Sequence, residues 1–274
     1  MHDIYIPYGA YWSTPFARWQ GSLAHLHSLT FAADVAKRAL AKRAIDPSVF
    51  DHGTLGMTVP QQSAFYGLPW LMALVGNTSV TGPTINQACA TGVRVLQSCV
   101  AELREGNATV SLAIGTDRTS NGPHIYYPAP DATGGTGRHE NWILDNFGKD
   151  PFARVAMVDT AENVARKYGF GTGQQNELTL RRYAQYADAV ASDSAFLRRF
   201  MDLPFDVPDA ALRKTRSTLD GDEGVFATTA AGLANLAPVV ENGTVPYGSQ
   251  THPADGSAAV VLTTTGKLPE LTRA

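Results

Sequence analysis

The stretch Ile85-Asn86-Gln87-Ala88-Cys89-Ala90-Thr91-Gly92 decides how this chain folds. Residues 80–85 before it are rich in β-branched side chains and predict a strand. The residues after it carry apolar side chains three or four positions apart, the spacing of one helix face: Val93, Leu96, Val100 and Leu103. Gly106 fits the end of that helix. Cys89 is therefore predicted where a strand turns into a helix.

A cysteine at the start of a helix can serve as a nucleophile. Its side chain faces the first unbonded N–H groups and the positive end of the helix dipole. That setting lowers the pKa of a thiol and increases the share of thiolate, the nucleophilic form. Gly92 has no side chain and leaves room for another backbone or a ligand. Position alone still favours the simpler interpretation, a buried structural cysteine.

Composition limits the classes of protein that this chain can belong to. It has 274 residues, 44% hydrophobic and 17% charged, enough for one large domain or two small ones. A net charge of −3 gives no indication of nucleic-acid binding. Cys89 and Cys99 would lie about 15 Å apart on one helix, too far for a disulfide, and this cysteine usage fits a reducing cytoplasm. We find no signal-peptide pattern at the start and no apolar stretch long enough to span a membrane.

Strand and helix patterns alternate along much of the chain, which predicts a layered α/β domain. The expected elements are strands at 4–6, 54–59, 109–115 and 258–262 and helices at 29–44, from Pro60 to 74, 159–167 and 173–191. Asp159 and Glu162 have the spacing of a capping box at the start of their helix. The acidic stretch 220–224 is predicted to be a solvated turn.

From residue 116 to about 158 the periodicity fails, and the sequence predicts a long loop. Its segment Gly134-Gly135-Thr136-Gly137 lacks the Lys-Ser/Thr ending of a phosphate-binding loop. A cover over a site or an oligomer contact is the favoured interpretation. The histidines His124, His139 and His252 have no spacing that pairs them with Cys89. No pair of them has metal-ligand spacing, so we expect no metal.

The segment from Asn86 to Gly92 resembles the nucleophile motif of thiolases, the acyl-CoA acetyltransferases. That motif has Asn, two residues, Cys, two small residues and Gly. Three further stretches are similar to thiolase segments in the same order along the chain: 113–121, 157–166 and 243–259. Four ordered matches outweigh the argument from position and favour Cys89 as a nucleophile. They cover the N-terminal half of a thiolase.

The resemblance implies a thiolase-like layered αβα fold, with the helix after Cys89 buried at its centre. Residues 1–274 would form the N-terminal thiolase domain, including a loop-rich insertion at about 118–250, and the C-terminal domain would be absent. Cys89 would attack the thioester carbonyl of an acyl-CoA, with its own backbone N–H as one donor to the oxyanion. Coenzyme A enters as a substrate carrier, and no permanently bound cofactor is implied. The coenzyme A contacts implied by the resemblance are Met157, Val240, Gly248 and Thr251.

The motifs of the second thiolase half, Asn-Glu-Ala-Phe, Gly-His-Pro and Cys-x-Gly, do not occur in this chain. In the family, the histidine activates the nucleophile and the second cysteine acts as an acid and base. Three further departures concern coenzyme A binding. Ala156 stands where many thiolases have His, His252-Pro253 replaces Gly-Ile, and Tyr247 replaces a small residue and is predicted to narrow the pantetheine tunnel.

The predicted function is that of the N-terminal half of an acyl-CoA acyltransferase of fatty acid metabolism, catalysing thiolysis or Claisen condensation. The expected partners are acyl-CoA, further copies in a dimer or tetramer, and a C-terminal half or complementary chain, with no nucleic acid or membrane. One alternative is a non-catalytic partner subunit or degenerate thiolase. A ketoacyl-synthase-type enzyme shares only Ala88-Cys89 with its usual Ala-Cys-Ser-Ser motif. A cysteine hydrolase of unrelated fold is a more distant alternative.

Overall fold

A computed structural model describes residues 3–120 and 122–272, and these fall into two compact units. The first unit takes in the described residues up to 120, residues 197–223 and the described residues from 254 onward. The second unit consists of residues 122–196 and 224–253. Residues 197–223, expected within a continuous insertion, thus belong to the first unit. The second unit is therefore built from two separate segments of the chain.

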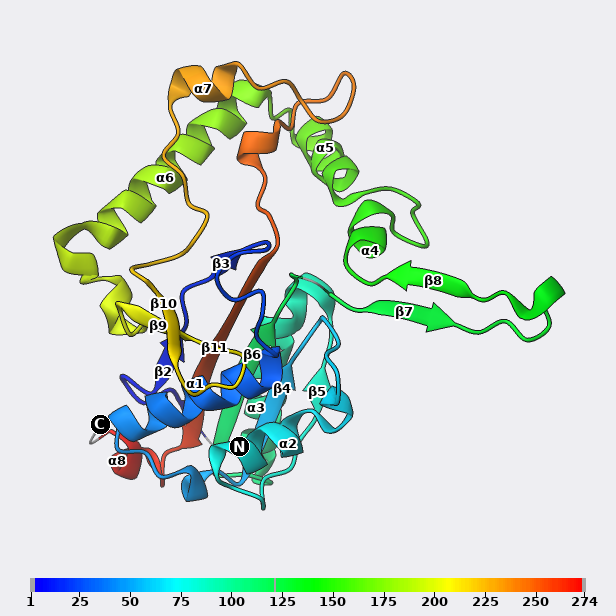
Figure 1. Ribbon diagram of the computed structural model, residues 1–274. Helices are drawn as coiled ribbons and strands as arrows, with labels where there is room; N and C mark the ends of the chain where they lie inside the picture. Colours follow the sequence, from blue (N-terminus) through cyan, green and yellow to red (C-terminus); the bar gives the residue numbers. More distant parts are fainter. Residues whose placement is uncertain (1–2, 121, 273–274) are drawn as a thin grey trace. The chain divides into compact units, whose positions relative to one another are not determined.

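The first unit is organised around a mixed seven-stranded sheet (Figure 1). The order is β1-β11-β6-β4-β5, and β2 and β3 also pair with β11. Strand β4 runs parallel to β5 and β6, whereas β11 is antiparallel to β6. The strands are β1 (Ile4–Tyr5), β2 (Tyr11–Ser13), β3 (Ala17–Arg18), β4 (His52–Gly56), β5 (Thr84–Ile85), β6 (Val110–Asp117) and β11 (Ala254–Thr264). A separate antiparallel pair is formed by β9 (Phe205–Pro208) and β10 (Thr215–Leu219).

Helices cover both faces of this sheet, which makes a layered αβα fold as predicted. The helices of the first unit are α1 (Ser28–Lys42), α2 (Leu68–Val75), α3 (Thr91–Glu105) and α8 (Leu268–Leu271). Two glycines of β4 show the layering, because residues three apart on a strand point to opposite faces. A Cβ at Gly53 would meet Leu68 of α2 at 3.2 Å, and one at Gly56 would meet Val95 of α3 at 2.9 Å. Helix α3 therefore lies directly on β4 at Gly56, with no room for a side chain between them.

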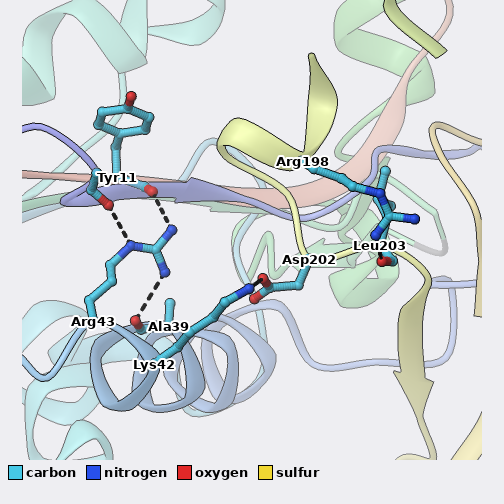
Figure 2. Close-up of polar contacts among 8 residues, drawn as sticks. Tyr11, Ala39, Lys42, Arg43, Arg198, Asp202 and Leu203 are labelled. Atoms are coloured by element: carbon cyan, nitrogen blue, oxygen red, sulfur yellow. Dashed lines mark hydrogen bonds and ion pairs between the residues drawn. The ribbon is translucent and has the colours of Figure 1, made fainter. Parts of the chain in front are cut away.

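The end of α1 is fastened to the N-terminal edge of the sheet by Arg43 (Figure 2). Its guanidinium donates to the carbonyl oxygens of Gly9 and Tyr11 and, at 3.0 Å, to that of Ala39 in the last turn. It also lies over the ring of Trp12. A cation suits this place because the last carbonyls of a helix lack partners inside the helix. One side chain thus joins α1 to β2.

Residues 197–203, which belong to the first unit, make two further contacts there, one to α1 and one within the segment itself (Figure 2). Lys42, in the last turn of α1, forms an ion pair with Asp202. Arg198 donates to the carbonyl oxygen of Leu203 within the same segment. Lys42 and Asp202 are far apart in the sequence, so sequence periodicity could not predict their ion pair.

Four local predictions for the first unit are wrong. Pro60 begins no helix, because Gly67, at φ +51°, separates the 3₁₀ turn Ala64–Tyr66 from α2. The strand expected at 80–85 is limited to Thr84–Ile85, since Gly82 has a φ of +148°. The third error concerns the central helix α3, which is only partly buried. Its buried face also differs from the predicted stripe: Val95, Cys99 and Leu103 are buried, whereas Val93 is 73% exposed.

The fourth error concerns the acidic stretch predicted to be a solvated turn. Asp222 accepts a hydrogen bond from the backbone N–H of Phe16 at 2.8 Å. Glu223 accepts from the backbone N–H of Ser22 at 2.8 Å, and its own N–H donates to the carbonyl oxygen of Phe16. The two acidic side chains therefore clamp the loop around Gly21, where an added Cβ would lie 2.0 Å from the Glu223 carboxylate.

The second unit is mostly helical. It contains the antiparallel pair β7 (His124–Tyr127) and β8 (Arg138–Asn141), with helices α4 (Leu144–Gly148), α5 (Met157–Tyr168), α6 (Thr172–Ser194) and α7 (Ala230–Ala234). Strands β7 and β8 pair only with each other, so residues 122–158 contribute no strand to the main sheet. Helix α6 matches its prediction and departs from helical geometry only at its end, at 191–194.

Helix α5 begins earlier than predicted, and Glu162 binds a distant segment instead of capping the helix. Asp159 accepts from the backbone N–H of Ala156 at 2.9 Å, so it lies inside the first turn instead of before it. Glu162 is buried and accepts from the backbone N–H groups of Thr244 and Val245, both at 2.7 Å, and from the Thr244 hydroxyl at 3.0 Å. This carboxylate thus joins α5 to the segment that follows Asn242.

We expect Glu162→Gln to destabilise the second unit by about 1–3 kcal/mol, because buried donors lose a charged acceptor. Partial burial raises the carboxyl pKa, but hydrogen bonds from Val245 and Thr244 outweigh it and lower the pKa overall. A lowered folded-state pKa gives stability that is present above the unfolded value of about 4.3 and lost as pH falls through the folded value. Hydrogen exchange at Thr244 and Val245, measured across this pH range, tests the prediction. Glu177→Gln is the control, since Glu177 forms an exposed ion pair with Arg181 on α6.

Candidate active site

Three neighbouring parallel strands end at the same edge of the main sheet. Strands β6, β4 and β5 are adjacent in the sheet, and their carboxyl ends lead to Asp117, Thr58 and the Cys89 turn respectively. In open α/β sheets this edge is where ligands bind, because the loops that leave the strands meet there. The candidate nucleophile is therefore at the edge of the sheet where a site is expected.

Cys89 lies immediately before α3, as the sequence predicts. The chain leaves β5 at Ile85, forms a 3₁₀ turn at Ala88–Ala90 and enters α3 at Thr91. The Cys89 side chain is exposed. Exposure excludes the alternative of a buried structural cysteine in this chain and leaves the thiol open to a reactant.

The turn that carries Cys89 is held in an unusual backbone conformation. Ala88 has a φ of +44°, in the left-handed region that costs a non-glycine residue about 1–3 kcal/mol. The Thr91 hydroxyl accepts from the Gln87 N–H at 2.8 Å and donates to the Ala88 carbonyl oxygen at 2.7 Å. The Asn86 side-chain oxygen accepts from the Ala88 N–H at 3.0 Å. These bonds brace the turn on both sides of the nucleophile.

The backbone N–H groups around Cys89 differ in whether they donate a hydrogen bond. Ala90 donates to the carbonyl oxygen of Gln87, and Thr91 donates to that of Ala88. Within residues 3–120 and 122–272, the N–H of Cys89 has no hydrogen-bond partner. An N–H at a helix start that is not engaged can donate to a developing oxyanion.

Cys99, the second cysteine, has a structural role. It is fully buried, packs with Val95 and Leu103 of α3, and lies in the core with Ala113 and Leu262. Burial raises the pKa of its thiol, and hydrogen bonding to Ser111 and Thr54 only partly opposes this effect. A protonated thiol enclosed in a core is a poor nucleophile. The two cysteines therefore differ in accessibility, and only Cys89 can meet a substrate.

Neither unit shows a histidine hydrogen-bonded to Cys89 among its described residues. In the first unit, His25 bonds the carbonyl oxygen of Pro208, and His27 that of Gln62, at 2.8 and 2.7 Å. His52 is bonded to the Ser111 hydroxyl, and burial lowers its pKa. In the second unit, His124 and His139 stack with ring centroids 5.0 Å apart, and His252 is exposed.

The four predicted coenzyme A contacts all belong to the second unit. Met157 is the first residue of α5 and is 52% exposed. Val240 accepts from the N–H of Gly243 at 2.9 Å in a tight turn. Gly248 lies in the 3₁₀ turn Tyr247–Ser249, where an added Cβ would meet Leu233 and Leu236. Thr251 is exposed. Their assignment to coenzyme A remains a prediction.

Two kinds of functional feature are absent from the part of the chain that the structure describes. Among the residues that the structure describes, no three His, Cys, Asp or Glu side chains come together as a metal site. Across the same residues, no helix is both long and apolar enough to cross a membrane.

Sequence reasoning missed Thr91, the residue that braces the turn from inside. Its hydroxyl is hydrogen-bonded to Gln87 and Ala88, four and three residues earlier in the chain. A threonine at the start of a helix, close to unbonded N–H groups, is a frequent capping residue and could have indicated this role. The residues that hold the turn from other strands, described below, have no such local pattern.

Comparison with known proteins identifies the family. The profile "Thiolase, N-terminal domain" matches residues 10–266. The chain is 28% identical over 257 residues to beta-ketothiolase BktB of Cupriavidus necator, covering 91% of this chain and 63% of that protein. It is 29% identical over 287 residues to an acetyl-CoA acetyltransferase of Pseudomonas aeruginosa, covering 99% of this chain and 68% of that protein.

Solved structures show the same fold. Human mitochondrial 3-ketoacyl-CoA thiolase, crystallised with CoA, has a TM-score of 0.86 at 24% identity over 98% of this chain and 66% of its own. The acetyl-CoA acetyltransferase of Bacillus anthracis has a TM-score of 0.85 at 24% identity over 99% of this chain and 68% of its own. The chain spans about two thirds of the length of such proteins. It belongs to the thiolase family and contains that family's N-terminal domain.

Proposed function

We propose that this chain carries the nucleophile of an acyl-CoA acyltransferase. The Cys89 thiolate attacks the carbonyl carbon of an acyl-CoA, and the bond between that carbon and the coenzyme A sulfur breaks. Coenzyme A leaves as a thiolate and takes up a proton, and the acyl group stays on Cys89 as a thioester. It then passes to another coenzyme A thiol in thiolysis, or to the α-carbon of a second acyl-CoA in Claisen condensation.

The observation that carries this proposal is the exposure of Cys89 at the start of α3, beside its own unengaged N–H. One group supplies the attacking atom, and the other can donate to the oxyanion that the attack creates. Both come from the same residue, so their spacing is set by the backbone. Membership of the thiolase family supports acyl-CoA as the substrate class.

The proposed reaction needs groups from a second thiolase half or a complementary chain. No histidine of the described residues is bonded to Cys89, so we assign the general base to that half. The surface beside the nucleophile supports such a partner. Val93 is 73% exposed on α3, and an added Cβ at Gly92 would meet no atom within 4 Å. An apolar side chain beside open space suits an interface.

We propose that the second unit binds the carrier. Met157, Val240, Gly248 and Thr251 would contact the coenzyme A arm, without a permanently bound cofactor. Further copies of the chain would associate as a dimer or tetramer. The two free cysteines agree with a reducing compartment, and we place the reaction in the acyl-CoA metabolism of the cytoplasm.

Acylation by acetyl-CoA tests the proposed function. We expect the folded chain, incubated with acetyl-CoA, to gain the mass of one acetyl group, located at Cys89 by peptide mass spectrometry. The control is the urea-unfolded chain, in which both cysteines are exposed and any reaction is that of ordinary thiols. Labelling of the folded chain no faster than this control, with and without a C-terminal thiolase half, would support a non-catalytic partner subunit instead.

A further inference from the structure

Asp117, the last residue of β6, holds the segment that follows β4. Its Oδ1 accepts from the backbone N–H groups of Thr58 and Val59 at 2.8 and 2.9 Å. Its Oδ2 accepts from the Thr58 hydroxyl at 2.7 Å. A carboxylate with three donors on two consecutive residues fixes both the position and the orientation of that backbone.

The same segment holds the nucleophile turn. The N–H of Met57 donates to the carbonyl oxygen of Ile85 at 3.1 Å. The Asn86 side-chain nitrogen donates to the carbonyl oxygen of Thr58 at 3.4 Å, and the Asn86 side-chain oxygen accepts from the Ala88 N–H at 3.0 Å. A continuous series of hydrogen bonds therefore leads from the Asp117 carboxylate to the residue before Cys89.

We infer that Asp117 is a positioning residue for the Cys89 nucleophile, acting through Thr58 and Asn86. The left-handed conformation of Ala88 is unfavourable for a residue with a side chain, so it persists only where surrounding bonds impose it. Thr91 supplies part of that support from α3, and the series that begins at Asp117 supplies the rest from the sheet. The catalytic consequence rests on the proposed acyl transfer, but the effect on the turn does not.

Asp51 provides a matched control for a substitution at Asp117. Its Oδ2 accepts from the backbone N–H and hydroxyl of Thr109, at 2.8 and 2.6 Å, and its Oδ1 accepts from the N–H of Val110 at 3.1 Å. The chemistry is the same as at Asp117: one threonine hydroxyl and two consecutive backbone N–H groups. Asp51 precedes β4 and Val110 begins β6, so this clamp lies at the opposite end of the same two strands.

The test compares Asp117→Ala with Asp51→Ala by two measurements on the folded chain. In Asp117→Ala we expect hydrogen exchange at the Ala88 N–H to become about tenfold faster, measured relative to amides in the middle of β6. A change of this size is typical of the loss of a charge-assisted hydrogen bond. We expect alkylation of Cys89 by iodoacetamide to slow about two- to fivefold as its alignment with the helix start is lost. Asp51→Ala should lower global stability without either local change.

Equal changes at the Cys89 turn in both variants would overturn the inference, since they would reflect general destabilisation. Asp117→Asn is expected to restore most of the wild-type behaviour, because its side-chain oxygen can accept from both N–H groups and its amide can donate to the Thr58 hydroxyl. Asn86→Ala covers the case in which Asp117→Ala does not fold. It breaks a later step at an exposed residue, and unchanged exchange at Ala88 in this variant would also contradict the inference.

A kinetic measurement separates this inference from the proposed function. In a chain assembled with a C-terminal thiolase half, we expect Asp117→Ala to lower kcat with KM nearly unchanged, because the substrate-binding residues are untouched. If the assembled wild-type chain shows no acyl transfer, the proposed function fails. The exchange and alkylation results would still decide whether Asp117 positions Cys89.

Discussion

Cys89→Ala is expected to abolish thiolysis of acetoacetyl-CoA by this chain when it is assembled with a C-terminal thiolase half. Loss of the nucleophile removes the covalent step, and such substitutions lower kcat by about 10⁶-fold in enzymes that depend on one nucleophile. The measurement is the rate of acetoacetyl-CoA loss at saturating coenzyme A. The Cys89 side chain is exposed, so the variant should keep wild-type stability.

Cys99→Ala is the matched control for this experiment, because it removes the same sulfur atom from the other cysteine, which lies on α3. Cys99 lies on the buried face of α3 and burial raises the pKa of its thiol, so it takes no part in attack. The variant should lose stability because it leaves a small cavity in the core, but it should keep most of its activity. Activity that survives in Cys89→Ala but disappears in a folded Cys99→Ala would reverse the assignment of the nucleophile.

The chain by itself is expected to turn over acetoacetyl-CoA hardly at all, and a complementary C-terminal half should restore the reaction. A missing general base typically costs about 10²–10⁴-fold in rate. A missing oxyanion donor costs about 10²–10³-fold. The two losses are not simply additive, but either one leaves little activity. The experiment titrates the chain with the C-terminal half and follows the rate at each ratio.

A rate that rises and saturates as the C-terminal half is added would agree with this prediction. Full turnover by the chain alone would contradict it, and would assign the base to a histidine of this chain. Three single substitutions would then identify which one: His124→Ala, His139→Ala and His252→Ala. All three histidines belong to the second unit and are exposed, so replacing them should not disturb the packing of the protein. Slow acylation of Cys89 without turnover is compatible with the prediction.

Local features of the fold could be predicted because neighbouring residues determine them. Helices α1 and α6, expected at 29–44 and 173–191, occur at Ser28–Lys42 and Thr172–Ser194. Their periodic apolar positions extend over several turns, and this is the most dependable pattern in a sequence. Cys89 was likewise placed at the start of a helix by the strand, small residues and helix that surround it.

The buried face of α3 shows where local patterns stop being sufficient. The apolar residues of α3 form two overlapping stripes, one through Val93 and one through Val95, and both continue to Leu103. The sequence favoured the first stripe, but the turn at Ala88 directs the second against Gly56 of β4. Which stripe is buried depends on the angle at which the helix leaves the sheet. The spacing of apolar residues gives no information about that angle.

The sequence by itself determined the alternation of strands and helices, the place of Cys89 and the family, because each depends on residues that are close together or occur in a fixed order. Only the tertiary structure decided which side chains hold the nucleophile turn. Asp117 at the end of β6 bonds to Thr58 after β4, and Thr58 bonds to Asn86 after β5. Such bonds have no period and no fixed spacing. They exist only once parallel strands have brought their carboxyl ends to one edge of the sheet.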